Sequence, residues 1–124
     1  MKLRIHGNSI RLRLNRREVA QFAGTGQIAE TVEFGPDQQL RYGLESSPDA
    51  ARVEARFSGA DIMIVLPANA AREWGETERV AVQGDQALGT GKSLAILVEK
   101  EFRRLHGATL DPELYPNPLE ARTR

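Results

Sequence analysis

The 124-residue sequence contains no cysteine, which excludes disulfide bonds and thiolate chemistry. Only 6% of its residues are aromatic, and no apolar run approaches the ~20 residues that a membrane-spanning helix needs. An excess of either charge is also lacking, since 17 basic residues balance 17 acidic ones. We therefore expect a soluble cytoplasmic protein without a signal segment or membrane partner, and the length suits one domain.

The first half of the chain alternates apolar and polar residues in short stretches, which predicts strands that bury one face. The expected strands are residues 2–6, 10–14, 28–34 and 40–44. After the second stretch, Asn15 is a preferred helix N-cap and Glu18 completes the pattern of a capping box. A helix is therefore expected after Asn15, ending at the glycines of residues 24–26.

The same order of elements returns in the second half. A shift of 52 residues lays it on the first half from Leu3 to Ala29, and a two-residue expansion of the second hairpin loop aligns the last strands. Turn and core positions agree, so we interpret the chain as a duplicated ββαββ unit in a β-rich α+β fold. The predicted organisation is one domain over 1–103, with copy one at 1–47 and copy two at 51–100, followed by an extended proline-containing tail at 104–124.

Two stretches carry a family resemblance. Gly7-Asn8-Ser9, a spacer and Arg13-Leu14 before a helix resemble the DNA-binding half of MazE-type antitoxins, and residues 62–67 look like the same AbrB-like class. The resemblance covers residues 2–100 and implies a swapped-hairpin-like barrel with two short helices, here as a pseudo-dimer within one chain. Asn15 departs from the family, which has proline there. The opening and the Pro-Asn-Pro of the tail also resemble small uncharacterised bacterial proteins, for which no activity is implied.

The strongest functional signal is the placement of charge in the first 17 residues, which include six basic residues and no acidic one. Alternate side chains of a hairpin share a face, so these residues predict a basic surface for phosphates, with Asn8 available for a base edge. The predicted nucleic-acid-binding residues are Lys2, Arg4, His6, Asn8, Arg11, Arg13, Arg16 and Arg17. The alternatives are another anionic partner, or a solvated strand face whose arginines pair with carboxylates elsewhere.

The second hairpin is different, because its outward positions include apolar Met63 and Val65. Apolar residues on an outer face indicate a cover, which either the tail or a second chain would supply. The predicted partner-binding residues are Met63, Val65, Leu114 and Tyr115. The two copies thus share a core pattern and differ in surface chemistry.

Chemistry-bearing motifs are few. His6 and His106 have no neighbouring ligand residues in the sequence, so neither a metal nor another cofactor is expected. Residues 89–93 resemble part of a phosphate-binding loop, but residue 86 is glutamine and residues 93–99 alternate as a strand, so we interpret a hairpin loop. No catalytic constellation is found, and we do not expect an enzyme.

Two functional hypotheses follow. The first is a DNA-binding regulator or antitoxin-like protein that binds duplex DNA with the basic first hairpin. The second is a non-catalytic interaction module that uses the apolar second hairpin and the tail, as a monomer or a homodimer. A ligand-binding or enzymatic cleft between the copies is a third, weaker alternative.

Overall fold

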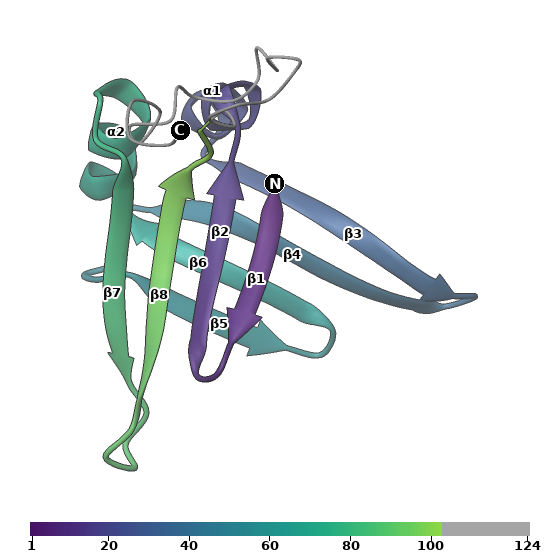
Figure 1. Cartoon of the computed structure of the whole chain (residues 1–124). Coiled ribbons are helices and arrows are strands. Elements are labelled where there is room, and N and C mark those ends of the chain that lie inside the picture. Colours follow the sequence, from purple (N-terminus) through teal and green to yellow (C-terminus); the bar gives the residue numbers. More distant parts are fainter. Residues whose placement is uncertain (103–124) are drawn as a thin grey trace, which may run out of the picture.

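The computed structural model describes residues 1–102, which form eight strands and two helices (Figure 1). The first copy comprises β1 (Lys2–His6), β2 (Ser9–Leu14), α1 (Arg16–Thr25), β3 (Gln27–Gly35) and β4 (Gln38–Ser47). The second comprises β5 (Glu54–Ser58), β6 (Asp61–Pro67), α2 (Ala68–Glu76), β7 (Ala81–Ala87) and β8 (Ser93–Lys100). The predicted β-rich α+β class and the repeated element order are confirmed. No helix in this part of the chain is long and apolar enough to cross a membrane.

Each of the two sheets takes one hairpin from each copy. Their strand orders are β1-β2-β8-β7 and β3-β4-β6-β5, with antiparallel hairpins and a parallel pair at each centre. The expected exchange of hairpins is therefore present within one chain. The expected barrel does not close, because no backbone ladder among the described strands joins one sheet to the other.

Strand pairing corrects one detail of the internal alignment. Ile28 pairs with Leu44 in the first copy and Val82 pairs with Val98 in the second, so equivalent residues here are 54 apart. The two additional residues thus lie between α2 and β7, not in the second hairpin loop as the sequence predicted. Burial agrees, since Val82 is 2% exposed, whereas Val80, the match expected from the sequence, is 44% exposed.

The core lies between the sheets and beneath the helices. At its centre Phe22 of α1 and Trp74 of α2, which are equivalent in the two copies, meet edge to face with ring centroids 6.0 Å apart. The surrounding buried residues come from both copies: Ile10, Leu12, Leu14, Val19, Ile28, Leu44, Val53, Ile64, Leu66, Ala71, Val82, Ile96 and Val98. One aromatic pair thus joins the two units where their helices meet.

The ends of the helices differ between the copies. The Asn15 side chain accepts a hydrogen bond from the Glu18 backbone N–H, and Glu18 accepts one from the Asn15 backbone N–H, each at 2.9 Å. This confirms the predicted capping box. The second helix follows Pro67 without a side-chain cap, and its Trp74 donates from Nε1 to the Val80 carbonyl at 2.9 Å.

Removing the central aromatic pair tests its role in the fold. We expect Trp74→Ala to lower the free energy of unfolding by about 3–5 kcal/mol, because it leaves a cavity where the copies meet. Urea unfolding followed by circular dichroism measures the loss. Phe57→Ala is the matched control, since Phe57 is 76% exposed and its loss should cost no more than about 0.5 kcal/mol. Similar losses in both variants would contradict the central role of the pair.

Candidate functional site

The predicted basic surface lies on the outer face of the sheet that contains β1, β2, β8 and β7. Strand register places the outward side chains of three strands in rows: Lys2, Arg13 and Glu99; Arg4, Arg11 and Leu97; His6, Ser9 and Ala95. The first hairpin therefore does gather its basic strand residues on one face, as predicted. Arg16 and Arg17 are exposed on α1, outside these rows.

Carboxylates from the end of the second copy interrupt this surface. Arg13 Nε lies 2.7 Å from Glu99 Oε2, and Arg11 Nε lies 3.5 Å from the same oxygen. Lys2 pairs with Glu101. The expected continuous basic face is therefore partly neutralised, which reduces its attraction for a polyanion.

The half of the hairpin near its turn retains more positive charge. Arg4, His6, Ser9 and Arg11 line an open depression of about 260 Å³. Within residues 1–102, Arg4 and His6 form no ion pair. The exposed Asn8 donates from Nδ2 to the Ser93 carbonyl at 2.6 Å, which holds the turn against β8 and uses one of the two amide hydrogens.

The second hairpin offers less apolar surface than the sequence predicted. Val65 is fully buried, because β6 is a central strand whose neighbours place Glu45 and Glu54 on either side of it. The expectation that Val65 presents a binding surface is therefore wrong for this structure, and Met63 is only half-buried. The two remaining predicted partner-binding residues, Leu114 and Tyr115, lie outside the described residues, as does His106.

The described residues offer little for a metal or a small ligand. No group of three or more histidine, aspartate or glutamate side chains in residues 1–102 could hold a metal ion. A second open depression, of about 520 Å³, lies over β2, β8 and β7 and is lined by Ser9, Arg11, Gln83 and Asp85 among others. It lies over one sheet, where β2 of the first copy meets β8 and β7 of the second.

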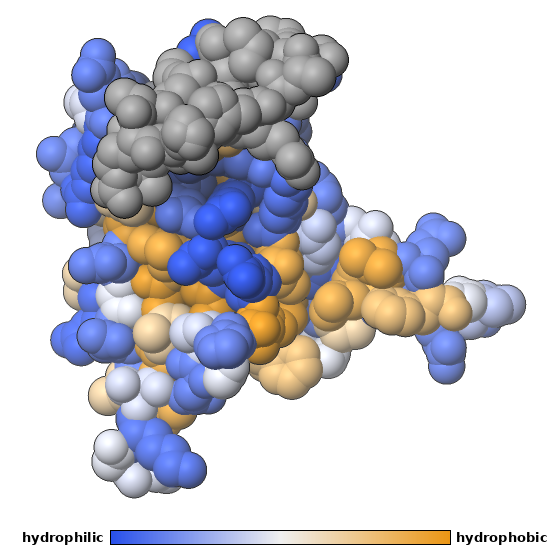
Figure 2. Space-filling view, in the orientation of Figure 1, coloured by the Kyte–Doolittle hydropathy of each residue, from blue (hydrophilic) through white to orange (hydrophobic). Residues whose placement is uncertain are grey.

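The surface where the two sheets separate was not predicted from the sequence. The hairpin of β3 and β4 continues past the rest of its sheet (Figure 1), and β4 pairs with β6 only from Arg41 onward. Residues 32–40 therefore pair only with one another, and we call them the arm. Figure 2 shows apolar surface beside β1 and along the arm.

Three large apolar side chains define this surface, which we call the open seam. Ile5 is 62% exposed on β1, and Val32 and Phe34 are 40% and 69% exposed on the arm. Strand alternation places Ile5 on the face of its sheet that bears Leu3 and the core, so the seam continues the core outward. The open seam is an apolar surface without a cover among the described residues.

The opposite edge of the molecule shows how the equivalent seam closes. There β5 contacts β7, and the Gln86 side chain accepts from the Ala55 backbone N–H at 2.6 Å and donates to the Ala55 carbonyl at 3.2 Å. With the shift of 54 residues, the equivalent of Gln86 is Val32, which has no group to hydrogen-bond with a strand edge. The first copy therefore lacks the polar bridge that holds its counterpart closed.

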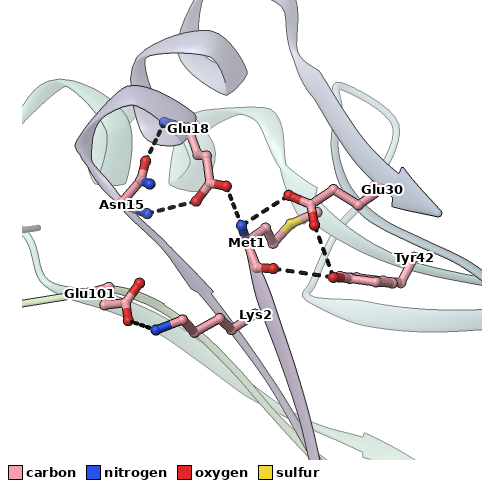
Figure 3. A network of polar contacts seen from close by, with 7 residues as sticks. All are labelled: Met1, Lys2, Asn15, Glu18, Glu30, Tyr42 and Glu101. Carbon is pink, nitrogen blue, oxygen red and sulfur yellow. Dashed lines mark hydrogen bonds and ion pairs between the residues drawn. The ribbon is translucent and has the colours of Figure 1, made fainter. Parts of the chain in front are cut away.

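Within residues 1–102, a polar network around Met1 joins β1 to its neighbours at the helix end of the open seam (Figure 3). The Met1 ammonium lies 3.0 Å from Glu30 Oε2 and contacts Glu18, and the Tyr42 hydroxyl donates to Glu30 Oε1 at 3.0 Å. The network ties the start of β1 to α1, β3 and β4. Beyond it, β1 and β3 diverge.

The network shifts the pKa values of its members. Burial opposes the charged form of the Met1 ammonium, but the hydrogen bonds to Glu18 and Glu30 raise its pKa above the ordinary value. Burial also opposes the Glu30 carboxylate, yet hydrogen bonds from the Met1 ammonium and Tyr42 lower its pKa. Burial, with the hydrogen bond to Glu30, raises the pKa of Tyr42 to about 12.

These shifts predict how stability depends on alkaline pH. The pKa of Tyr42 is higher in the folded chain than its ordinary value of 10.0, so the neutral phenol contributes stability that is fully present below pH 10.0 and is lost as the pH rises towards about 12. We expect the free energy of unfolding to fall over this interval, and to fall less in Tyr42→Phe. Urea unfolding at a series of pH values measures both slopes. Parallel slopes would show that Tyr42 does not titrate with folding.

The whole sequence was compared with known families, proteins and structures. Residues 1–119 match the model of a family of unknown function, DUF7009. Searches of curated proteins and of solved structures found no match. The match extends across both copies, both sheets and most of the tail. The chain therefore belongs to the DUF7009 family of unknown function.

Proposed function

We propose that this protein is a non-catalytic interaction module that binds a protein partner through the open seam. The observation that carries the proposal is the exposure of Ile5, Val32 and Phe34, between 40% and 69%, at the edge where β1 and β3 separate. Apolar surfaces that continue a core outward, with polar residues at their rim, are typical of protein interfaces. Burying a large apolar side chain contributes about 1.5–3 kcal/mol, so a partner seated here gains substantially.

The chemistry of the seam also favours this function over catalysis. Its members are one phenylalanine and two branched aliphatic residues, which supply contact area and no proton transfer or nucleophile. The neighbouring Arg4 and His6 provide a polar rim along the outer face of β1. Aromatic anchors surrounded by polar residues resemble the arrangement that carries most of the affinity in known interfaces.

Charged substitutions in the seam test the proposal. We expect Ile5→Asp with Phe34→Asp to reduce the recovery of a co-purifying partner at least about tenfold, because a buried unpaired carboxylate is strongly unfavourable. The measurement is quantitative mass spectrometry of proteins retained by the tagged chain in its own cells. Val80→Asp with Leu88→Asp is the control, since both residues are exposed apolar residues that flank β7, away from the open seam.

The controls distinguish binding from folding. Thermal unfolding should show both double variants to be folded, because all four residues are exposed. Retention of every partner by the seam variant would refute the proposed function. So would an equal loss in the control variant.

A second candidate function is binding of duplex DNA through the first hairpin. It is favoured by the depression lined by Arg4, His6 and Arg11, where Arg4 is free of ion pairs within residues 1–102. Arginine side chains in an open depression can bind phosphates, and the resemblance to MazE-type antitoxins favours the same hairpin. The carboxylate of Glu99 weighs against it, because it compensates Arg11 and Arg13.

Charge reversal tests this second candidate. If the hairpin binds phosphates, Arg4→Glu with Arg11→Glu should weaken binding to a mixed-sequence duplex at least about tenfold and reduce its dependence on salt. Fluorescence anisotropy across a salt series measures both quantities. Arg52→Glu with Arg72→Glu is the charge-matched control on other exposed arginines. Absence of binding by the wild-type chain at low salt would exclude this function.

A further inference from the structure

We propose that the open seam is filled by a second molecule of this chain. In this dimer, β3 of each protomer lies along β1 of the other protomer. The inference rests on the proposed function in taking the open seam as the binding surface, and it names the occupant. It follows from three observations. The edges of β1 and β3 pair with no other described strand, apolar and charged side chains alternate along both edges in the same way, and the two edges carry opposite charge.

Both strands that border the seam have an edge that pairs with no other described strand. In the strand orders of the two sheets, β1 and β3 are terminal strands, and β3 extends over nine residues. No third strand within residues 1–102 pairs with the arm, and a two-stranded hairpin by itself is only marginally stable in water. A long, partly apolar edge is also a template for pairing with another chain. The arm therefore has a structural reason to gain a partner.

The two edges match in the alternation of their side chains. Along β1, Ile5 faces the core side and Arg4 faces outward; along β3, Val32 faces the core side and Glu33 faces outward. Pairing β3 of a second molecule with β1 places Val32 of that molecule on the same face of the extended sheet as Ile5. It places Glu33 on the side of Arg4. Cross-strand pairs of this kind stabilise a sheet on both faces.

The charges of the two edges are complementary. Glu33 and Asp37 on the arm are exposed and form no ion pair within the described part of the chain. Residues 1–17, which include β1, contain no acidic residue, and Arg4 and His6 are exposed. An acidic, apolar arm thus fits a basic, apolar edge. Since every copy carries both elements, the contact is reciprocal and closes as a two-fold dimer.

The second copy of the repeat already shows the closed arrangement. There β7 lies against β5, with Gln86 hydrogen-bonded to Ala55, while Val53 packs so closely on Gly84 that a Cβ at residue 84 would lie 3.0 Å from Val53 Cβ. The equivalent of Gly84 is Glu30, whose side chain turns to the Met1 ammonium. The chain's own β3 is therefore held away from β1, and β3 of another molecule takes that place.

Charge reversal and its repair test the dimer. Sedimentation velocity of the full chain up to about 0.1 mM should show a species of twice the 13.7 kDa monomer mass. We expect Glu33→Lys, and separately Arg4→Glu, to raise the dimer dissociation constant at least about tenfold, because like charges then oppose one another. Combining the two substitutions should restore the dimer. Asp49→Lys is the control for charge reversal at an exposed residue elsewhere.

The outcomes separate this inference from the proposed function. A wild-type monomer throughout this concentration range overturns the dimer, as does a dimer that neither reversal weakens or that the combined variant fails to restore. If the chain is monomeric but a different protein depends on Ile5 and Phe34, the proposed function stands without the dimer. If the dimer responds as expected and no other protein depends on the seam, the dimer stands alone.

Discussion

The contact between Phe22 and Trp74 is the interaction on which the rest of the structure depends. Each residue belongs to the helix that connects the two hairpins of its copy, and those hairpins lie in different sheets. Fixing the two helices against one another therefore fixes where all four hairpins leave them. Parallel pairing of β2 with β8 and of β4 with β6 then completes the arrangement.

That constraint leaves the distant ends of the sheets free to differ. Near the helices the two copies share backbone contacts. The hydrogen bond from the Ser46 N–H to the Gly26 carbonyl has its counterpart from the Lys100 N–H to the Val80 carbonyl. Farther away, a glutamine closes one seam and a valine leaves the other open. The duplication thus preserves a scaffold at one end and permits divergence of surface at the other.

Local patterns made much of the fold predictable. The cap formed by Asn15 and Glu18 depends on residues three apart, and strand alternation needs only neighbours, so both could be inferred from the sequence. The position of the insertion could not, because Val80 and Val82 both fit an alternating strand. Burial of one and exposure of the other is decided by pairing with β8.

The surfaces were less predictable for the same reason. Arg13 is neutralised by Glu99, which is 86 residues away in the chain, and nothing local indicates that pair. Val65 is buried by its neighbours across the sheet. At the open seam, Val32 occupies the position that Gln86 occupies in the other copy. The equivalence of these two residues follows from strand pairing and could not be inferred from the alignment of the two halves.

The exchange of hairpins also has a consequence for synthesis on the ribosome. The first sheet needs β8, the last of the eight described strands to be translated, before β2 gains its parallel neighbour. Until then the hairpin of β1 and β2 has only itself to pair with among the described strands, although it precedes the others. A chain of this topology cannot complete either sheet copy by copy as it emerges, because each sheet waits for a hairpin of the second copy.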